Sequence, residues 1–199
     1  MSLLKSAWEI ALEKTDSIKP NPEKTRLEAL RTEGRKLAGL LLASDDPEDA
    51  SVEKAYVQYS AEDKVYVREG IATTVVMNIA LPQQNDIGQR LDKLQQLVKL
   101  VDGKEHSGSQ VFEQLKRFLE QYITAREKLI ERAKQQYLPI FQEKQERLAQ
   151  KYGKGVDLSM EQDPEFIQML QNGFSQLNGQ YQRALDQGKE QLKAVWKIA

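Results

Sequence analysis

The second half of the chain is dominated by apolar residues that recur at alternating spacings of three and four. One run begins after Ser109 and a second begins after Asp163, and the positions between the apolar residues are mostly charged or glutamine. This spacing places the apolar side chains on one stripe of an α-helix, which is how long helices pack side by side. It therefore predicts two long helices that bury their stripes against each other.

The first run predicts a helix from about Ser109 to Tyr152. Its apolar stripe consists of Phe112, Leu115, Leu119, Tyr122, Leu129, Ala133, Tyr137, Ile140, Leu148 and Tyr152. Arg126 and Lys144 occupy two further positions of the same stripe. Pro139 has no amide hydrogen and its ring clashes with the preceding turn, so we expect a kink near Gln135–Pro139.

The second run begins with a recognisable helix start. Asp163 is suited to an N-cap, Pro164 to the first helical position and Glu165 to the first turn. The apolar stripe that follows consists of Phe166, Ile167, Leu170, Phe174, Leu177, Tyr181, Leu185, Leu192, Val195 and Trp196. About ten residues join the two long helices, which favours an antiparallel helical hairpin.

Three glycines interrupt the second long helix, and their positions differ. Gly173 and Gly188 lie close to the apolar stripe, where they would allow the other helix to approach closely, whereas Gly179 has no packing reason.

The first hundred residues predict shorter helices, punctuated by prolines and acidic loops. Their approximate ranges are 2–18, 22–43, a short helix ending near 59, and 84–101. On the second of these, Gly34, Ala38 and Gly39 would leave room for a neighbouring helix. Asn21 before Pro22, and Ser60 before Ala61, are suited to N-caps.

The segment Lys64–Leu81 is ambiguous. It is rich in β-branched residues, and Val65-Tyr66-Val67 alternates as a strand does. Ala61, Val65, Ile71, Val75, Val76 and Ile79 nevertheless lie near one helical stripe. We favour a helix, because an isolated hairpin in a helical protein would be only marginally stable.

Together these patterns predict an all-α protein. Residues 1–102 would form an N-terminal helical cluster and residues 109–199 a long, coiled-coil-like helical hairpin, separated by the polar, glycine-containing segment between them. One continuous elongated domain is the alternative.

Composition excludes several classes of function. The 29 basic and 30 acidic residues are interleaved, so that no basic cluster suited to nucleic acid is present. The absence of cysteine fits a cytoplasmic protein and rules out thiolate metal sites. The N-terminus lacks the pattern of a signal peptide, and no apolar run approaches the roughly 20 residues that span a bilayer.

Residues that perform chemistry are scarce. His106 is the single histidine and stands in a Gly/Ser-rich loop, where we interpret it as a solvated side chain. One histidine without cysteine cannot assemble a common transition-metal site, and Gly153-Lys154-Gly155 has neither the preceding strand nor the following residues of a phosphate loop. We therefore expect no catalytic residue, no cofactor and no metal.

The pattern resembles that of bacterial helical adaptor, stalk and stress-coat proteins, although no motif is specific to one family. We predict a non-catalytic helical protein for protein–protein interaction or assembly, which forms a homodimer, binds a helical partner, or both. The candidate anchors are the aromatic and leucine residues of the hairpin, since aromatic residues are common interface hot spots: Phe112, Leu119, Tyr122, Phe174, Tyr181 and Trp196. The alternative is a peripheral membrane protein that uses Leu3, Leu4 and Trp8.

Overall fold

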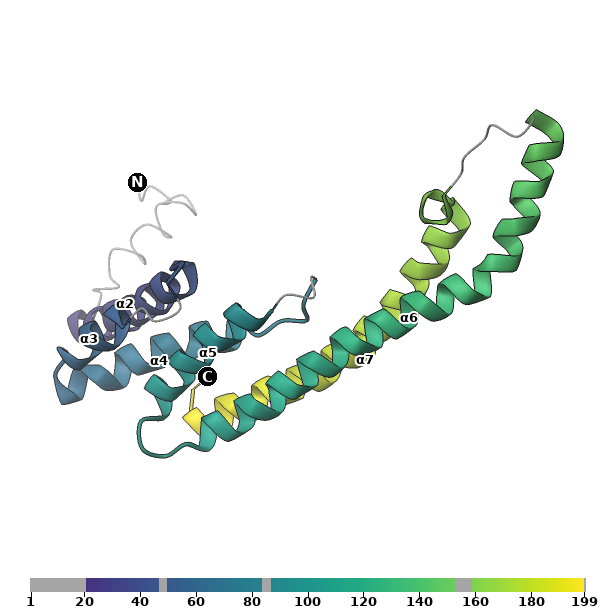
Figure 1. Cartoon of the computed structure of the whole chain (residues 1–199). Helices are drawn as coiled ribbons and strands as arrows, with labels where there is room; N and C mark the ends of the chain where they lie inside the picture. Colours follow the sequence, from purple (N-terminus) through teal and green to yellow (C-terminus); the bar gives the residue numbers. More distant parts are fainter. Residues whose placement is uncertain (1–20, 47–49, 84–86, 153–158, 199) are drawn as a thin grey trace, which may run out of the picture. The chain divides into compact units, whose positions relative to one another are not determined.

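The computed structural model describes residues 21–46, 50–83, 87–152 and 159–198. All secondary structure in these residues is helical, which confirms an all-α fold for this part of the chain. The elements, labelled in Figure 1, are α2 (Pro22–Ala43), α3 (Ser51–Val57), α4 (Ala61–Asn78), α5 (Gly88–Asp102), α6 (Ser107–Tyr152), the 3-10 helix η1 (Met160–Gln162) and α7 (Pro164–Trp196). The helix predicted at 2–18 lies outside the described residues.

The predicted helix starts are confirmed by side-chain caps. Asn21 Oδ1 accepts hydrogen bonds from the Glu23 and Lys24 amides at 3.0 and 3.4 Å. Asp163 Oδ1 accepts one from the Glu165 amide at 3.0 Å. Each cap satisfies amide groups that the first turn of a helix leaves without a partner.

Residues 64–78 of the ambiguous segment lie in a helix, α4, and residues 79–81 follow it without helical structure. On α4, Val67, Ile71 and Val75 recur at spacings of four and are buried, as is Ile79 just after the helix. Ala61 and Val65 of the predicted stripe are instead exposed. The threonines are accommodated because Thr73 and Thr74 donate hydroxyl hydrogen bonds to carbonyl groups one turn earlier, at 2.8 and 3.0 Å. Burial of one helical stripe therefore outweighs the strand preference of the individual residues.

The chain divides into two compact units, Met1–Thr74 and Val75–Ala199. In the first unit, α2 and α4 cross where Gly34 meets the Val67 carbonyl and Gly70 meets the Arg31 carbonyl. A Cβ atom at either glycine would overlap that carbonyl oxygen, so the contact between the two backbones depends on both glycines. The close approach predicted at Gly34 is confirmed, whereas nothing packs against Gly39.

Ion pairs flank this crossing on the outer side of the helices. Arg31 Nε lies 2.6 Å from Glu69 Oε2, and Arg26 Nη2 lies 2.6 Å from Asp63 Oδ1. The pairs link α2 to α4, but because their side chains are partly exposed we expect them to set the register more than the stability.

In the second unit, α6 and α7 run alongside each other in opposite directions (Figure 1). Leu115 on α6 faces Gly188 on α7, the Tyr122 hydroxyl donates to Asn178 Oδ1 at 2.7 Å, and Leu129 faces Gly173. The residue numbers rise along α6 as they fall along α7. The predicted roles of Gly173 and Gly188 are confirmed, and Gly179 faces open space.

Helix α5 covers the first part of α6. Its leucines and valines form the core of this region: Leu91, Leu94, Leu97, Val98 and Val101 are all buried. Helix α6 continues through Pro139 without a break in its helical assignment. The kink near Gln135–Pro139 and the domain boundary between residues 102 and 109 stay predictions.

Candidate functional site

The six predicted anchors fall into two groups. Phe112, Leu119, Tyr122 and Trp196 are 0–4% exposed, so that they hold the second unit together and present little surface to a partner. Phe174 and Tyr181 are half-buried. The Tyr181 ring packs against Phe118 and Tyr122, with centroid separations of 5.1 and 5.2 Å.

Arg126, which interrupts the apolar stripe of α6, joins three parts of the second unit. Its guanidinium lies over the rings of Tyr122 and Phe174, at 5.9 and 5.4 Å from their centroids. Its Nη1 donates to the carbonyl oxygens of Pro82 and Gln83 at 3.1 and 2.9 Å. The cation thus ties the segment after α4 to the α6–α7 pair by cation–π contacts and hydrogen bonds.

Lys144, the second interruption, pairs with the start of α7. Its Nζ lies 3.0 Å from Asp163 Oδ2 and 2.9 Å from Glu165 Oε2, and it donates to the Tyr137 hydroxyl at 2.7 Å. The hydrogen bonds to Tyr137 and Glu165 raise the pKa of Lys144, and Asp163 adds to this effect. Burial works to raise the pKa of Asp163, but the hydrogen bonds from Lys144 and its neighbours outweigh it and hold that pKa below its usual value.

Asp102 forms a third polar centre, at the opposite end of the α6–α7 pair. Its carboxylate accepts hydrogen bonds from the Trp196 indole at 2.8 Å, the Gly108 amide at 3.0 Å and the Ser109 amide at 2.6 Å. The Ser109 hydroxyl donates a fourth at 2.7 Å. Burial would raise the pKa of Asp102, but the bonds from Trp196, Ser109 and Gly108 outweigh it and lower the pKa.

A groove of about 370 Å³ runs between α6 and α7. Its lining is mainly apolar and small, with two cations and a glutamine on the α6 side: Ala125, Lys128, Leu129, Arg132, Ala133, Gln136, Met169, Gly173 and Leu177. We refer to these nine residues as the α6–α7 groove. Leu129 packs over Gly173 in the floor, since a Cβ atom there would lie 3.2 Å from the Leu129 methyl carbons.

Lys128 and Arg132 stand one helical turn apart on the rim of this groove, and both are exposed. Within the described ranges, neither forms an ion pair, although Lys134 close by pairs with Glu161 at 3.3 Å. The groove was not predictable from the stripe positions alone, because most of its charged lining lies beside the stripe. The signal that could have found it is a pair of cations at i and i+4 beside the stripe.

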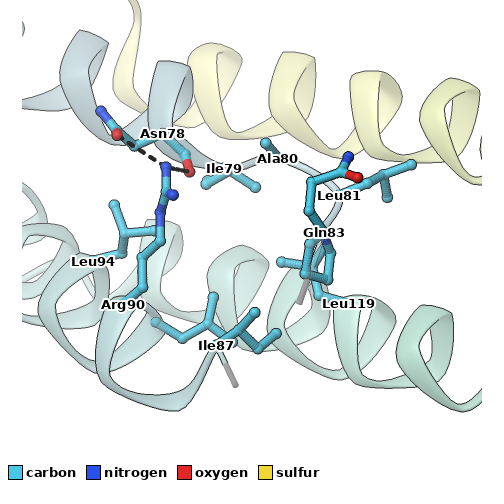
Figure 2. Close-up of a pocket in the computed structure, with 11 residues that line it drawn as sticks. Asn78, Ile79, Ala80, Leu81, Gln83, Ile87, Arg90, Leu94 and Leu119 are labelled. Carbon is cyan, nitrogen blue, oxygen red and sulfur yellow. Dashed lines mark hydrogen bonds between the residues drawn. The ribbon is translucent and has the colours of Figure 1, made fainter. Parts of the chain in front are cut away.

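A second pocket, of about 380 Å³, lies beside the segment that joins α4 to α5 (Figure 2). Leu91, Leu94 and Leu119 contribute to its mainly apolar lining. Arg90 Nη2 donates to the carbonyl and side-chain oxygens of Asn78, both at 3.2 Å. Arg90 is the one ionisable residue in the lining, so the described part of this pocket lacks the pair of groups that general acid–base catalysis uses.

The described part of the chain offers neither a metal site nor a membrane-spanning helix. No group of three histidine, cysteine or acidic side chains is arranged there to hold a metal ion. In the same residues, no helix combines the length and apolar character needed to cross a membrane. His106 is exposed, as expected, and its backbone is left-handed with φ 54°.

Comparison with known proteins gives one match. The profile of a family of unknown function, DUF6657, matches residues 53–194. No curated protein and no solved structure matches. The matched range runs from α3 to the last turn of α7, and therefore includes the groove and the residues around Asp102 and Lys144.

Proposed function

We propose that this chain, which belongs to the DUF6657 family of unknown function, is a non-catalytic helical protein for protein–protein interaction or assembly. In this proposal it acts in the cytoplasm, and α6 and α7 form a coiled-coil-like helical hairpin that is its working surface. The chain assembles as a homodimer, binds a helical partner protein, or both.

Exposed apolar side chains on α6 and α7 carry the proposal. Leu138 and Ile140 are each 46% exposed, and Ile167 is 39% exposed. In the sequence they are neighbours of Tyr137, Phe141 and Phe166, which belong with Ala133 to a small buried cluster. Burial of such exposed apolar side chains against a partner is favourable, so they are candidates for a contact site.

The polar groups of the pair fit a structural role better than a catalytic one. Lys144, Asp163 and Asp102 are satisfied by one another or by neighbouring donors, and they fasten helix ends. A reacting group generally needs an open position for a substrate, which none of these three contacts provides.

The burial of four predicted anchors refines the proposed surface. Phe112, Leu119, Tyr122 and Trp196 would shape the hairpin from inside. The residues that touch a partner would be the half-buried Phe174 and Tyr181, together with the three exposed aliphatic residues.

Sedimentation of the full-length chain tests this proposal. We expect a dimer at concentrations on the order of 10 µM, and we expect Leu138→Gln, Ile140→Gln and Ile167→Gln together to shift it to monomer. Met77→Gln is the control, since Met77 is 73% exposed but lies at the end of α4.

Two results would count against the working surface. One is a sharp monomer at that concentration with no capture of a partner protein. The other is unchanged assembly and partner capture after Phe174→Ala and Tyr181→Ala. Flotation with liposomes in the absence of assembly would instead favour the membrane alternative, whose residues Leu3, Leu4 and Trp8 lie outside the described range.

A further inference from the structure

We infer that the α6–α7 groove binds an acidic amphipathic helix of a partner protein. This inference rests on the proposed function, and it names the class of partner and one further binding place on the same two helices, whose lining is distinct from the contact residues proposed above. The shape, lining and charge of the groove each support it.

The groove is long enough to accept a short helix. Its lining spans Ala125 to Gln136 on α6, a distance of about 16 Å along a helix at 1.5 Å per residue. Three turns of an incoming helix would cover this length. Helices that bind in grooves insert apolar residues at spacings of three and four, and a continuous apolar floor accepts such residues.

The floor of the groove is formed mainly by apolar and small residues of both helices. Leu129 from α6 and Met169 and Leu177 from α7 are half-buried, so that they combine intramolecular packing with exposed area. Gly173 lies between the two α7 residues, one turn from each. Tyr181, one further turn along α7, is not part of the lining, and its ring packs against Phe118 and Tyr122.

Charge decides which kind of helix fits. The α7 side of the lining carries no charge, and the α6 side carries Lys128 and Arg132. These two are separated by four residues, about 6 Å on a helix surface. In the described residues neither has an acidic partner, so that acidic side chains at i and i+4 of a bound helix would pair with both. Such complementarity favours an acidic helix and disfavours a basic one.

Two synthetic peptides and the full-length chain test this inference. Each peptide has about 20 residues with leucine at alternating spacings of three and four. One carries glutamate at the flanking positions and the other carries lysine there. Fluorescence anisotropy should show the acidic peptide binding at least about tenfold more tightly than the basic one, and this preference should weaken as salt is added.

Charge reversal in the groove should reverse the preference. We expect Lys128→Glu with Arg132→Glu to weaken binding of the acidic peptide by about tenfold or more and to strengthen binding of the basic peptide. Both side chains are exposed, so the fold should persist. The matched control is Lys104→Glu with Arg117→Glu, which changes net charge equally at exposed positions outside the groove and should leave affinity within about twofold.

Several outcomes would overturn the inference. Equal binding of the two peptides, or equal losses in the groove and control variants, would show that the groove does not select acidic helices. Binding of phosphatidylglycerol vesicles that depends on Lys128 and Arg132, without peptide binding, would assign the groove to a lipid surface. If the groove variants abolish self-association in sedimentation, the occupant is a second copy of the chain. Self-association that persists while the acidic peptide fails to bind would refute this inference and leave the proposed function standing.

Discussion

The α6–α7 pair is closed at each end by a buried aspartate, and the two ends differ in what the aspartate binds. At one end, Asp102 accepts hydrogen bonds at the start of α6 and from Trp196 on α7. At the other, Asp163 caps the start of α7 and pairs with Lys144 on α6. Each carboxylate therefore stabilises a helix N-terminus and holds the neighbouring helix beside it.

The donors at the two ends have different chemistry. Every donor to Asp102 is neutral, and both Asp102 and Trp196 are at most 6% exposed. The side chain of Asp163 is 3% exposed, whereas that of its cationic partner Lys144 is 30% exposed and also contacts Glu165. A carboxylate surrounded by fixed, buried neutral donors is sensitive to geometry, while one paired with a half-solvated cation is sensitive to pH and salt.

Removing each carboxylate gives the largest expected contrast. We expect Asp102→Ala to lower the free energy of unfolding by about 3 kcal/mol, because it leaves the Trp196 indole and two amides without a buried acceptor. Asp163→Ala should lower it by about 1–2 kcal/mol, mainly through loss of the cap, since water can reach Lys144. Urea denaturation followed by circular dichroism measures both. A larger loss of unfolding free energy for Asp163→Ala than for Asp102→Ala would show that the charged end contributes more stability than the neutral one.

A glycine tests how tightly the Asp102 end is packed. A Cβ atom at Gly108 would overlap Trp196 Nε1 and Asp102 Oδ1, so we expect Gly108→Ala to destabilise the protein by about 2 kcal/mol. The control is Gly179→Ala, where nothing lies within 4 Å and the higher helix propensity of alanine should stabilise the protein by about 0.5–1 kcal/mol. Thermal unfolding should move in opposite directions for the two variants. The same sign for both would show that Gly108 is not sterically constrained.

These contacts also show how far the sequence could be interpreted. Helix starts at Pro22 and Pro164 were predictable because the cap lies within three residues of the amides it satisfies. The glycines at the stripe were predictable because spacing alone places them there. Interactions between residues distant in the sequence were not predictable from local patterns. Asp102 was assigned to a loop boundary, and nothing in the local pattern links it to Trp196, 94 residues later.

The charged residues in the apolar stripe show the same limit. The period places Arg126 and Lys144 in the contact between α6 and α7. Arg126 binds the carbonyl groups of Pro82 and Gln83, and Lys144 pairs with Asp163 and Glu165. The positions of these partners depend on how the chain folds back, which the local sequence does not reveal. For the predicted anchor residues, the sequence pattern indicated a partner surface where the structure has a core. Aromatic character made Phe112 and Tyr122 candidates for a partner surface, yet such residues also fill a core, and in the structure they are buried.

The stability contributed by the two ends of the α6–α7 pair should depend differently on alkaline pH. Both aspartates have lowered pKa values in the folded state, so both contribute stability above about pH 4 that is lost on acidification. The pKa of Lys144 is raised, so its contribution is full below about pH 10 and is lost as the pH rises further. We expect stability above about pH 10 to fall less in Lys144→Met than in the unsubstituted chain. Identical alkaline profiles, measured by urea denaturation at each pH, would remove Lys144 as the cause.

Added salt should change stability least, but it should distinguish the Asp163 end from the Asp102 end most clearly. At about 1 M salt the screening length is about 3 Å, so the attraction between Lys144 and Asp163 should weaken, because the lysine is partly exposed. The contact between Asp102 and Trp196 involves a neutral donor and is buried, which protects it from screening. Double-mutant cycles measure each coupling: Lys144→Met with Asp163→Asn, and Trp196→Phe with Asp102→Asn. We expect only the first coupling to decrease with salt. If both decrease together, the two ends share one electrostatic mechanism, and the distinction between neutral and charged donors would not govern their behaviour.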